Sequence, residues 1–383
     1  MKRVIYIILT MFIFCSFNVV KAEQIDLAES AVSAILIEPS TGEVIFEKNS
    51  HEKLHPASMT KMMSMLLIIE NIEKGVISWD EMVTTSPNAS GMGGSQILLE
   101  TGEQMSVRDL FKGIAVASGN DAVVAMAEKI AGTEGMFVSM MNERAKQLGL
   151  TDTNFKNPHG LDAADHYSSA YDMSIIAKEL VKHSQVLEYT SIYEDYLRQN
   201  TDRKIWLVNT NKLVRFYPGV DGLKTGYTKE AGYCLTATAK KGNSRFIAVV
   251  MGEADSKTRN AEVSEMLDYA FAQYEVEEIL SKDTIVGKVP VTLGNKTEVE
   301  IIPLESLSFL NKKGTEKRNI SYELKFSSLK SSLKVGDKVG EVNIKENDTV
   351  IKTIPVTVKE DISKVNILEL YLRNMKSILN GIF

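Results

Sequence analysis

The chain has 383 residues, of which 44% are hydrophobic and 25% are charged, values close to the average for soluble globular proteins. This length predicts two to three domains, and the apolar content, with 24 glycines and 8 prolines, excludes a disordered or collagen-like chain. The net charge of −6 lacks the basic excess of a nucleic-acid-binding protein, and two cysteines exclude a disulfide-dense scaffold.

The first 22 residues have the pattern of a secretory signal peptide. Two basic residues precede an apolar run over residues 4–17, and Val20 and Ala22 supply small residues before a cleavage site. The run is shorter than the roughly 20 residues of a transmembrane helix. Cleavage after Ala22 removes three basic residues and no acidic one, so we expect an exported mature chain with a net charge of −9 and Cys234 as its one thiol.

The next part of the chain, residues 23–278, predicts one α+β domain. Its predicted elements are, in chain order, a hairpin of strands over 34–38 and 43–48, a helix over 58–74, helices over 107–117 and 121–131, antiparallel strands over 235–239 and 246–251, and a closing helix over 261–274. Strands therefore lie at both ends of this region and helices lie between them. That order predicts a sheet that pairs early strands with late ones.

The pattern changes after residue 278. Short alternating runs follow over residues 286–291, 298–302, 321–326, 340–344 and 350–358, and turn residues separate them. We therefore expect a small all-β domain over residues 279–360.

The last segment, residues 361–383, is amphipathic. At 100° per residue, its apolar side chains from Val365 to Phe383 fall on one face and its polar side chains fall on the other. A terminal helix of this kind can lie in a membrane interface, and we expect it to anchor the protein there. Packing on the all-β domain and pairing with a second copy are the alternatives.

The first chemical motif is Ser58-Met59-Thr60-Lys61, at the start of the first long helix. Residues three apart share a helical face, so Lys61 can bring its amine beside the Ser58 hydroxyl. A serine hydroxyl is a weak nucleophile, and a lysine can act as its base when burial or neighbouring cations lower the lysine pKa. Taken alone, the motif is more often a capping serine followed by a surface lysine.

Two further motifs follow in order, Ser118-Gly119-Asn120 between two predicted helices and Lys224-Thr225-Gly226 before the late strands. The spacings from Ser58 to Ser118 and from Ser118 to Lys224 are 60 and 106 residues. Three such motifs in this order are typical of penicillin-binding proteins and class A β-lactamases.

The chemistry gives each motif residue a task in acyl transfer. Ser118 can relay a proton to the leaving amine, and Asn120 can hold the substrate amide. Lys224 supplies positive charge, Thr225 can bind a carboxylate, and Gly226 lets an extended substrate lie against the strand.

The chain resembles the low-molecular-mass penicillin-binding proteins that are D-alanyl-D-alanine carboxypeptidases. The segments that carry the resemblance are Pro56–Lys61, Ala117–Ala122, Asn157–Asp162, Tyr167–Met173 and Asp221–Thr228. The resemblance covers essentially the whole mature chain. It implies a transpeptidase domain of the penicillin-binding-protein and β-lactamase kind over 23–278, the all-β domain and the membrane-anchoring helix.

The resemblance also implies an activity and a set of roles. Ser58 would attack the penultimate D-alanine carbonyl of a peptidoglycan stem peptide that ends in D-Ala-D-Ala, release the terminal D-alanine, and be acylated by β-lactam antibiotics. The oxyanion would lie between the backbone N–H groups of Ser58 and Tyr227, and Arg259 would help to bind the terminal carboxylate. Asp172 and Arg203 would pair to brace a loop. No metal or other cofactor is expected, and the expected location is the outer face of the cytoplasmic membrane.

A class A β-lactamase is the nearest alternative enzyme. It shares the acylation residues and adds a glutamate that activates the deacylating water. The matching loop, residues 157–172, contains no glutamate. A β-lactamase also has no use for an all-β domain and a terminal helix.

A zinc protease is an alternative from another class. His51-Glu52-Lys53-Leu54-His55 matches the H-E-x-x-H motif, which requires both histidines on one helical turn. Pro56 follows His55 directly and disfavours helical geometry there, so we expect a polar loop.

A cell-wall binding protein that has lost catalysis is the remaining alternative. The intact residues Ser58, Lys61, Ser118, Asn120 and Lys224 argue against it, because a binding protein has no use for a nucleophile with its base. Two other features fit supporting roles: Cys234 as a buried inert thiol and the glycine-rich stretch 91–95 as a loop at the rim of the site.

Overall fold

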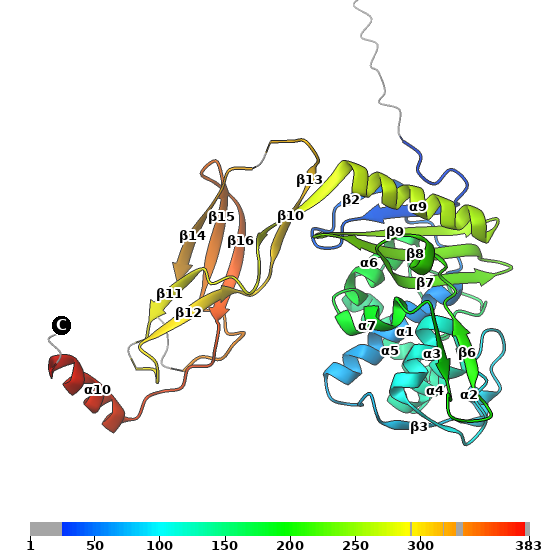
Figure 1. The fold of residues 1–383 in the computed structure, drawn as a ribbon, viewed down its shortest axis with the longest axis horizontal. Coiled ribbons are helices and arrows are strands. Elements are labelled where there is room, and N and C mark those ends of the chain that lie inside the picture. The colour runs from blue at the N-terminus through cyan, green and yellow to red at the C-terminus, as the bar shows by residue number, and fades with distance from the viewer. Residues whose placement is uncertain (1–24, 292, 317, 327–331, 380–383) are drawn as a thin grey trace, which may run out of the picture.

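The computed structural model describes residues 25–291, 293–316, 318–326 and 332–379. An α+β domain lies at one end of the molecule, a smaller β domain lies beside it, and the C-terminal helix lies at the opposite end (Figure 1). This confirms the predicted fold class. The predicted signal peptide lies outside the described residues.

A five-stranded antiparallel sheet organises the first domain. Its strands, in spatial order, are β2 (Val44–Lys48), β1 (Ser33–Ile37), β9 (Ser244–Glu253), β8 (Gly232–Lys241) and β7 (Val220–Thr228). The chain therefore pairs its earliest strand with a late one, Ser33 opposite Met251, as the order of the predicted elements requires. Strand β7, which contains Lys224-Thr225-Gly226, lies at an edge of the sheet.

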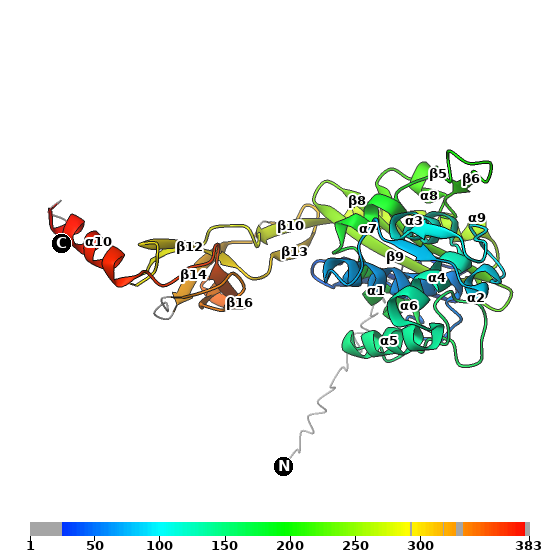
Figure 2. The same cartoon turned by 90° about the horizontal axis from the view of Figure 1, so that it is seen from below.

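Helices and two short hairpins fill the segment between β2 and β7. They are η1 (Ala57–Thr60), α1 (Lys61–Glu73), β3 (Met82–Thr84), α2 (Pro87–Ser90), β4 (Gln104–Ser106), α3 (Val107–Ala117), α4 (Asn120–Ala131), α5 (Glu134–Gln147), α6 (Ala170–Leu180), α7 (Ser184–Thr190), β5 (Glu194–Leu197), β6 (Ile205–Val208) and α8 (Leu213–Phe216). In Figure 2, which views the domain from below, α5 and α6 lie at one edge of the helical layer and β5, β6 and α8 lie at the opposite edge. The predicted helices over 107–117 and 121–131 are confirmed as α3 and α4.

The sheet packs a separate core on each of its faces, because successive side chains of a strand point to opposite sides. On β1, Ile35 and Ile37 join the core of helices α1 and α3–α6, while Ala34 and Leu36 join the core under α9 (Ser256–Gln273). Burial of apolar surface stabilises the folded state by roughly 25 cal/mol per Å². It is the main force that holds the helices against the two faces of the sheet.

Helix α1 is buried on all sides. The helical period places Met62, Met65, Leu66 and Ile69 on one face, and these four are buried. Met63, Leu67 and Ile68, on its other sides, are buried as well. The helix is therefore the central element of the helical layer and is not a surface helix.

The second domain contains two strands that the sequence analysis did not predict, β10 (Tyr274–Leu280) and β13 (Leu307–Lys312), which pair with each other. Its five-stranded sheet has the order β11 (Gly287–Pro290), β12 (Glu298–Pro303), β16 (Thr349–Val358), β15 (Gly340–Glu346) and β14 (Ile320–Phe326). Its small core includes Ile301, Val342 and Val356. The predicted all-β character is confirmed.

The chain ends in α10 (Ile367–Leu379). Val365, which the helical pattern placed on the apolar face, is buried and donates its backbone N–H to the Leu293 carbonyl of the β domain. Within the described residues, no helix combines the length and the hydrophobicity that crossing a bilayer requires.

Candidate active site

Ser58 lies on η1, the short 3-10 turn that leads into α1. Ala57 just before it has a φ of 46°, in the left-handed region that an L-residue with a side chain rarely occupies. Strained backbone of this kind is common beside reacting groups, since the surrounding packing must hold it in place. The turn therefore sets the direction of the Ser58 hydroxyl.

The Lys61 amine makes three short contacts. Its Nζ lies 2.9 Å from Ser58 Oγ, 2.7 Å from Asn120 Oδ1 and 2.6 Å from the His159 carbonyl oxygen. A neutral amine has two N–H donors and one lone pair. With its donors directed to Asn120 and His159, the lone pair of Lys61 is left to accept the proton of Ser58. The expected proximity of Ser58 and Lys61 is confirmed.

Burial and a neighbouring cation favour the neutral amine. The Lys61 side chain is fully buried, and burial first, then the charge of Lys224, lowers the pKa of Lys61 well below its ordinary value, while Asp121 acts in the opposite direction. Lys224 is buried too, and burial followed by the charge of Arg259 lowers its pKa to about 7. Burial and the neighbouring charge of Lys224 therefore both favour the neutral form of Lys61.

A tight loop over residues 157–161 presents the His159 carbonyl to Lys61. Asn157 Oδ1 accepts hydrogen bonds from the backbone N–H groups of His159 (3.3 Å) and Gly160 (2.6 Å). Gly160 has a φ of +86°, and a Cβ on it would lie 1.9 Å from the Ala57 carbonyl oxygen. The loop thus packs directly on the turn that carries the nucleophile.

Ser118-Gly119-Asn120 forms the link between α3 and α4. Ser118 ends α3 in the left-handed conformation, with a φ of 64°, and its buried Oγ has no hydrogen-bond partner among the residues described. Asn120 is fully engaged within the protein: its Oδ1 accepts from Lys61, and its Nδ2 donates to the Gly93 carbonyl at 2.7 Å. The Asn120 side chain therefore positions Lys61 and the glycine-rich loop.

Lys224-Thr225-Gly226 lies on β7, across from the turn that carries Ser58. Lys224 Nζ donates to the Thr225 carbonyl at 3.2 Å, and Thr225 Oγ1 donates to Thr210 Oγ1 at 2.7 Å. A Cβ on Gly226 would lie 2.7 Å from the Pro56 carbonyl oxygen. The glycine is therefore needed for the close approach of strand and turn, whatever lies along the strand.

Tyr227 and Arg259 lie differently from the other motif residues. Tyr227 is exposed and packs its ring on Tyr233, with centroids 4.3 Å apart. Arg259 is buried and donates to Asn260 Oδ1 at 2.9 Å. Cys234 lies opposite Gly226 in the sheet and is buried, which raises the pKa of its thiol to about 11.

The expected pair of Asp172 and Arg203 is wrong. Asp172 accepts hydrogen bonds from the Asp152 backbone N–H at 2.8 Å and the Thr153 hydroxyl at 2.7 Å. Arg203, just after the β5–β6 turn, lies 2.9 Å from a Glu103 carboxylate oxygen. Asp172 lies on α6 and Arg203 lies in the β5–β6 hairpin, so their partners come from different parts of the domain.

The segment over residues 51–55 is extended. Leu54 pairs in an isolated bridge with Ser168, and the two histidines face different acids: His51 Nδ1 lies 2.8 Å from Asp152, and His55 Nδ1 lies 3.9 Å from Asp162. Residues 51 and 55 therefore do not share the helical turn that H-E-x-x-H requires.

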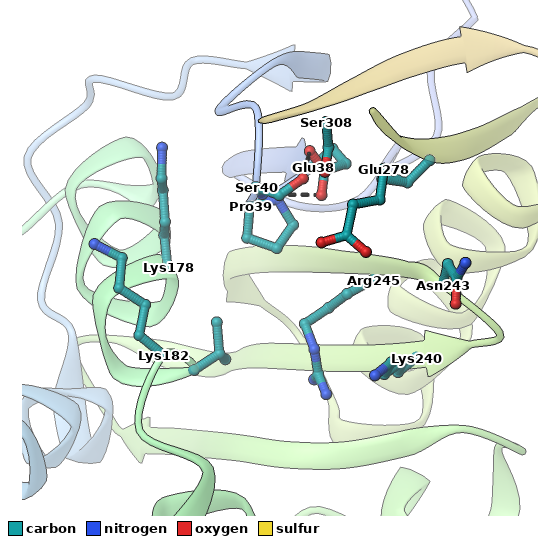
Figure 3. Close-up of a pocket in the computed structure, with 12 residues that line it drawn as sticks. Glu38, Pro39, Ser40, Lys178, Lys182, Lys240, Asn243, Arg245, Glu278 and Ser308 are labelled. Carbon is teal, nitrogen blue, oxygen red and sulfur yellow. Dashed lines mark hydrogen bonds between the residues drawn. The ribbon is translucent and has the colours of Figure 1, made fainter. Parts of the chain in front are cut away.

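A cavity of about 570 Å³ lies away from Ser58, where the β1–β2 turn, α6, the β8–β9 hairpin and β10 meet (Figure 3). None of the motif residues lines it. Two of its charged side chains have local partners: Glu38 accepts from Ser40 and Thr41, and Arg245 pairs with Asp221 at 2.7 Å. We therefore place the chemistry at Ser58 and not in this cavity.

The sequence motifs identified the polar side chains of the site but not its backbone acceptor. The His159 carbonyl is such a group, and no side-chain pattern reports the direction of a carbonyl. The turn signal Asn157-Pro158-His159-Gly160 was present, and it marked a loop without showing what the loop holds.

The fold and this arrangement define a class, the serine hydrolases with a buried lysine beside the serine. Comparison with known proteins then identifies the family. Residues 18–255 match the family described as D-alanyl-D-alanine carboxypeptidase, peptidase S11, and residues 274–364 match the C-terminal domain of penicillin-binding protein 5. The chain belongs to the D-alanyl-D-alanine carboxypeptidase family.

Individual relatives agree along most of their length. The chain is 52% identical over 351 residues to D-alanyl-D-alanine carboxypeptidase DacF of Bacillus subtilis (strain 168), covering 91% of this chain and 90% of that protein. It is 35% identical to DacC of Escherichia coli (strain K12), covering 92% and 88%.

Solved structures give the same result. Penicillin-binding protein 5 from Haemophilus influenzae matches with a TM-score of 0.69 at 31% identity, covering 88% of this chain and 98% of that one. Penicillin-binding protein D2 from Listeria monocytogenes, in an ampicillin-bound form, matches with a TM-score of 0.57 at 31% identity, covering 63% and 98%.

Proposed function

We propose that this enzyme removes the terminal D-alanine from peptidoglycan stem peptides through an acyl-enzyme on Ser58. The observation that carries the proposal is the hydrogen bond of 2.9 Å between Ser58 Oγ and the amine of Lys61, whose burial favours the neutral form. Family membership supplies the substrate class, a peptide that ends in D-Ala-D-Ala.

In the acylation step, Lys61 takes the Ser58 proton as Ser58 Oγ attacks the carbonyl carbon of the penultimate D-alanine. The negative charge on the carbonyl oxygen is held by the backbone N–H groups of Ser58 and Tyr227. The C–N bond to the terminal D-alanine then breaks, and its amine receives the proton from Lys61 through the free hydroxyl of Ser118. The products are a Ser58 ester and D-alanine.

In the deacylation step, a water molecule gives a proton to Lys61 and attacks the ester carbon. The C–O bond to Ser58 breaks, and Lys61 returns the proton to Ser58 Oγ.

The terminal carboxylate of the substrate is bound by positive charge and a hydroxyl donor. These come from the Lys224 ammonium, Arg259 and the Thr225 hydroxyl. The same site would take β-lactam antibiotics as acylating inhibitors.

We also propose that the enzyme is exported and held at the outer face of the cytoplasmic membrane by α10. Support comes from the exposure of its described apolar side chains. Ile367, Leu368, Tyr371, Leu372 and Met375 are all exposed, so the β domain does not cover that face. An amphipathic helix with such a face is suited to a membrane interface.

The test of the activity is mass spectrometry of a pentapeptide ending in D-Ala-D-Ala after incubation with the full mature chain. We expect the peptide to lose one alanine, and we expect Ser58→Ala to leave it intact. An unchanged peptide with the native enzyme would contradict the proposed activity. Rapid turnover of penicillin with no peptide cleavage would indicate a β-lactamase instead.

A further inference from the structure

The β5–β6 hairpin carries an exposed pair of aromatic side chains. Tyr196 on β5 lies directly opposite Trp206 on β6, and their exposed fractions are 38% and 58%. The next residues along the strands, Leu197 and Leu207, are buried. One face of the hairpin therefore packs on the protein, and the aromatic pair lies on the other face, which no described segment covers.

Charged groups lie over and beside this aromatic pair. The Lys204 ammonium lies over the Tyr196 ring, 3.9 Å from its centroid, and Glu194, two residues before Tyr196 on the same face, is exposed. The more exposed Trp206 ring offers a flat apolar surface with these polar groups beside it. Such a surface matches a pyranose ring, which presents C–H groups on its face and hydroxyl and amide groups around its edge.

The hairpin is fixed to the rim of the active site. Arg198 Nη1 donates to the Ile97 carbonyl at 2.9 Å, and Arg203 Nη2 donates to the Leu98 carbonyl at 2.8 Å. At its other end, β6 leads to Thr210, whose hydroxyl accepts from Thr225 at 2.7 Å. The aromatic face is thus held in place relative to the site before any ligand binds.

The length of a stem peptide is sufficient to span from the site to this face. Trp206 is four residues from Thr210, so their Cα atoms are at most about 14 Å apart. In a stem pentapeptide, four residues separate the scissile bond from the sugar that carries the peptide, again at most about 14 Å. A sugar of the glycan strand can therefore reach Trp206 while the D-alanyl end lies at Ser58.

We infer that Tyr196 and Trp206 form a glycan-binding subsite, on which an N-acetylated hexosamine ring of the glycan strand stacks while its stem peptide is cleaved. The inference rests on the proposed function, because it takes the substrate to be a stem peptide attached to a glycan. It makes the enzyme selective for glycan-linked peptides over free ones.

The first test compares two substrates, the free pentapeptide and the same pentapeptide on its disaccharide. We expect Trp206→Ala to lower kcat/KM about tenfold for the disaccharide-linked peptide and to leave the free peptide unchanged. Phe326→Ala, which removes an exposed aromatic ring of the β domain, is the matched control and should change neither. Equal losses on both substrates, or no loss on either, would overturn the inference.

The second test does not depend on catalysis, and so separates failure of the subsite from failure of the proposed function. A β-1,4-linked tetramer of N-acetylglucosamine should cause a saturable change in the tryptophan fluorescence of the full chain, and Tyr196→Ala should weaken that binding several-fold. If the tetramer causes no such change, the subsite does not exist. If Trp206→Ala instead dissociates a dimer in sedimentation, the face is an interface between copies, and the inference is equally overturned.

Discussion

At the scale of single residues, the site depends on how one lysine is kept neutral. Lys61 has three oxygen atoms around its amine, an arrangement that also suits an ammonium group. The balance is set by burial and by the nearby charge of Lys224, which both lower the Lys61 pKa. In the proposed mechanism, Lys224 therefore acts on Lys61 through space, in addition to its proposed role in binding the substrate carboxylate.

The effect of Lys224 on the Lys61 pKa predicts a shift in the pH dependence of acylation when Lys224 is replaced. A neighbouring cation disfavours the protonated amine, so replacing Lys224 with glutamine removes that effect and raises the Lys61 pKa. The acid limb of the rate of acylation by penicillin should move to higher pH. Stopped-flow acylation across pH measures it, with Lys229→Gln on the exposed β7–β8 turn as the control. A limb that stays in place or moves to lower pH would show that Lys224 does not tune the base.

A second prediction concerns Asn157, which holds the loop that presents the His159 carbonyl. Asn157→Ala leaves the N–H groups of His159 and Gly160 without their acceptor, so the carbonyl should move away from Lys61. We expect the acylation rate to fall by roughly a hundredfold, the size of effect that a misplacement of about 1 Å produces. Asn154→Ala, which breaks a comparable bond to the Asp165 carbonyl, should have little effect. Equal rates in the two variants would refute this positioning role.

Residue spacing predicted the contact of Ser58 with Lys61, because three residues make nearly one helical turn. The spacing could not predict that Asn120 turns toward Lys61 and Gly93, nor that Arg203 pairs with Glu103. Those partners come from segments that only the tertiary fold brings together.

At the scale of elements, the site is built where the η1 turn, the 157–161 loop and β7 pack without space between them. Two glycines allow this, Gly160 against Ala57 and Gly226 against Pro56. The predicted helix over 58–74 is confirmed for its α-helical part. Its first residues form a 3-10 turn instead, because β7 and the 157–161 loop pack against them. The strands β10 and β13 lacked a clear alternation, since each is only half-buried.

The contact of Gly160 with Ala57 predicts a large stability difference between two similar substitutions. Gly160→Ala would place a Cβ 1.9 Å from the Ala57 carbonyl oxygen, in addition to its unfavourable φ. We expect it to lower the free energy of unfolding by about 3 kcal/mol or more. Gly75→Ala has a similar positive φ but open space around the new Cβ, and should cost about 1 kcal/mol. Chemical denaturation measures both, and equal costs would mean that the packing described here is not what the loop requires.

At the scale of the whole molecule, the catalytic domain and α10 lie at opposite ends with the β domain between them (Figures 1 and 2). If α10 lies on a membrane, the β domain acts as a spacer that holds Ser58 away from the lipid surface. The amphipathic pattern of the terminal segment predicted the helix. It could not predict that Val365, on the same apolar face, is buried and donates its backbone N–H to the β domain.

This arrangement predicts a loss of membrane binding from two substitutions. Leu368→Glu combined with Leu372→Glu puts charge on the exposed apolar face of α10. Cosedimentation with anionic phospholipid vesicles should fall at least about tenfold, since two buried leucines are worth several kcal/mol. Glu369→Gln on the polar face is the control. Binding that survives the double substitution would place the membrane contact elsewhere, while penicillin acylation should be the same in all three proteins.

The central claim, that Ser58 is the nucleophile and Lys61 its base, is tested most directly by locating the covalent adduct. The full mature chain would be incubated with penicillin, digested, and mapped by mass spectrometry. We predict one penicilloyl group, on the peptide that contains Ser58, absent from Ser58→Ala and formed far more slowly in Lys61→Ala. An adduct on another residue, or one that persists in Ser58→Ala, would contradict the account.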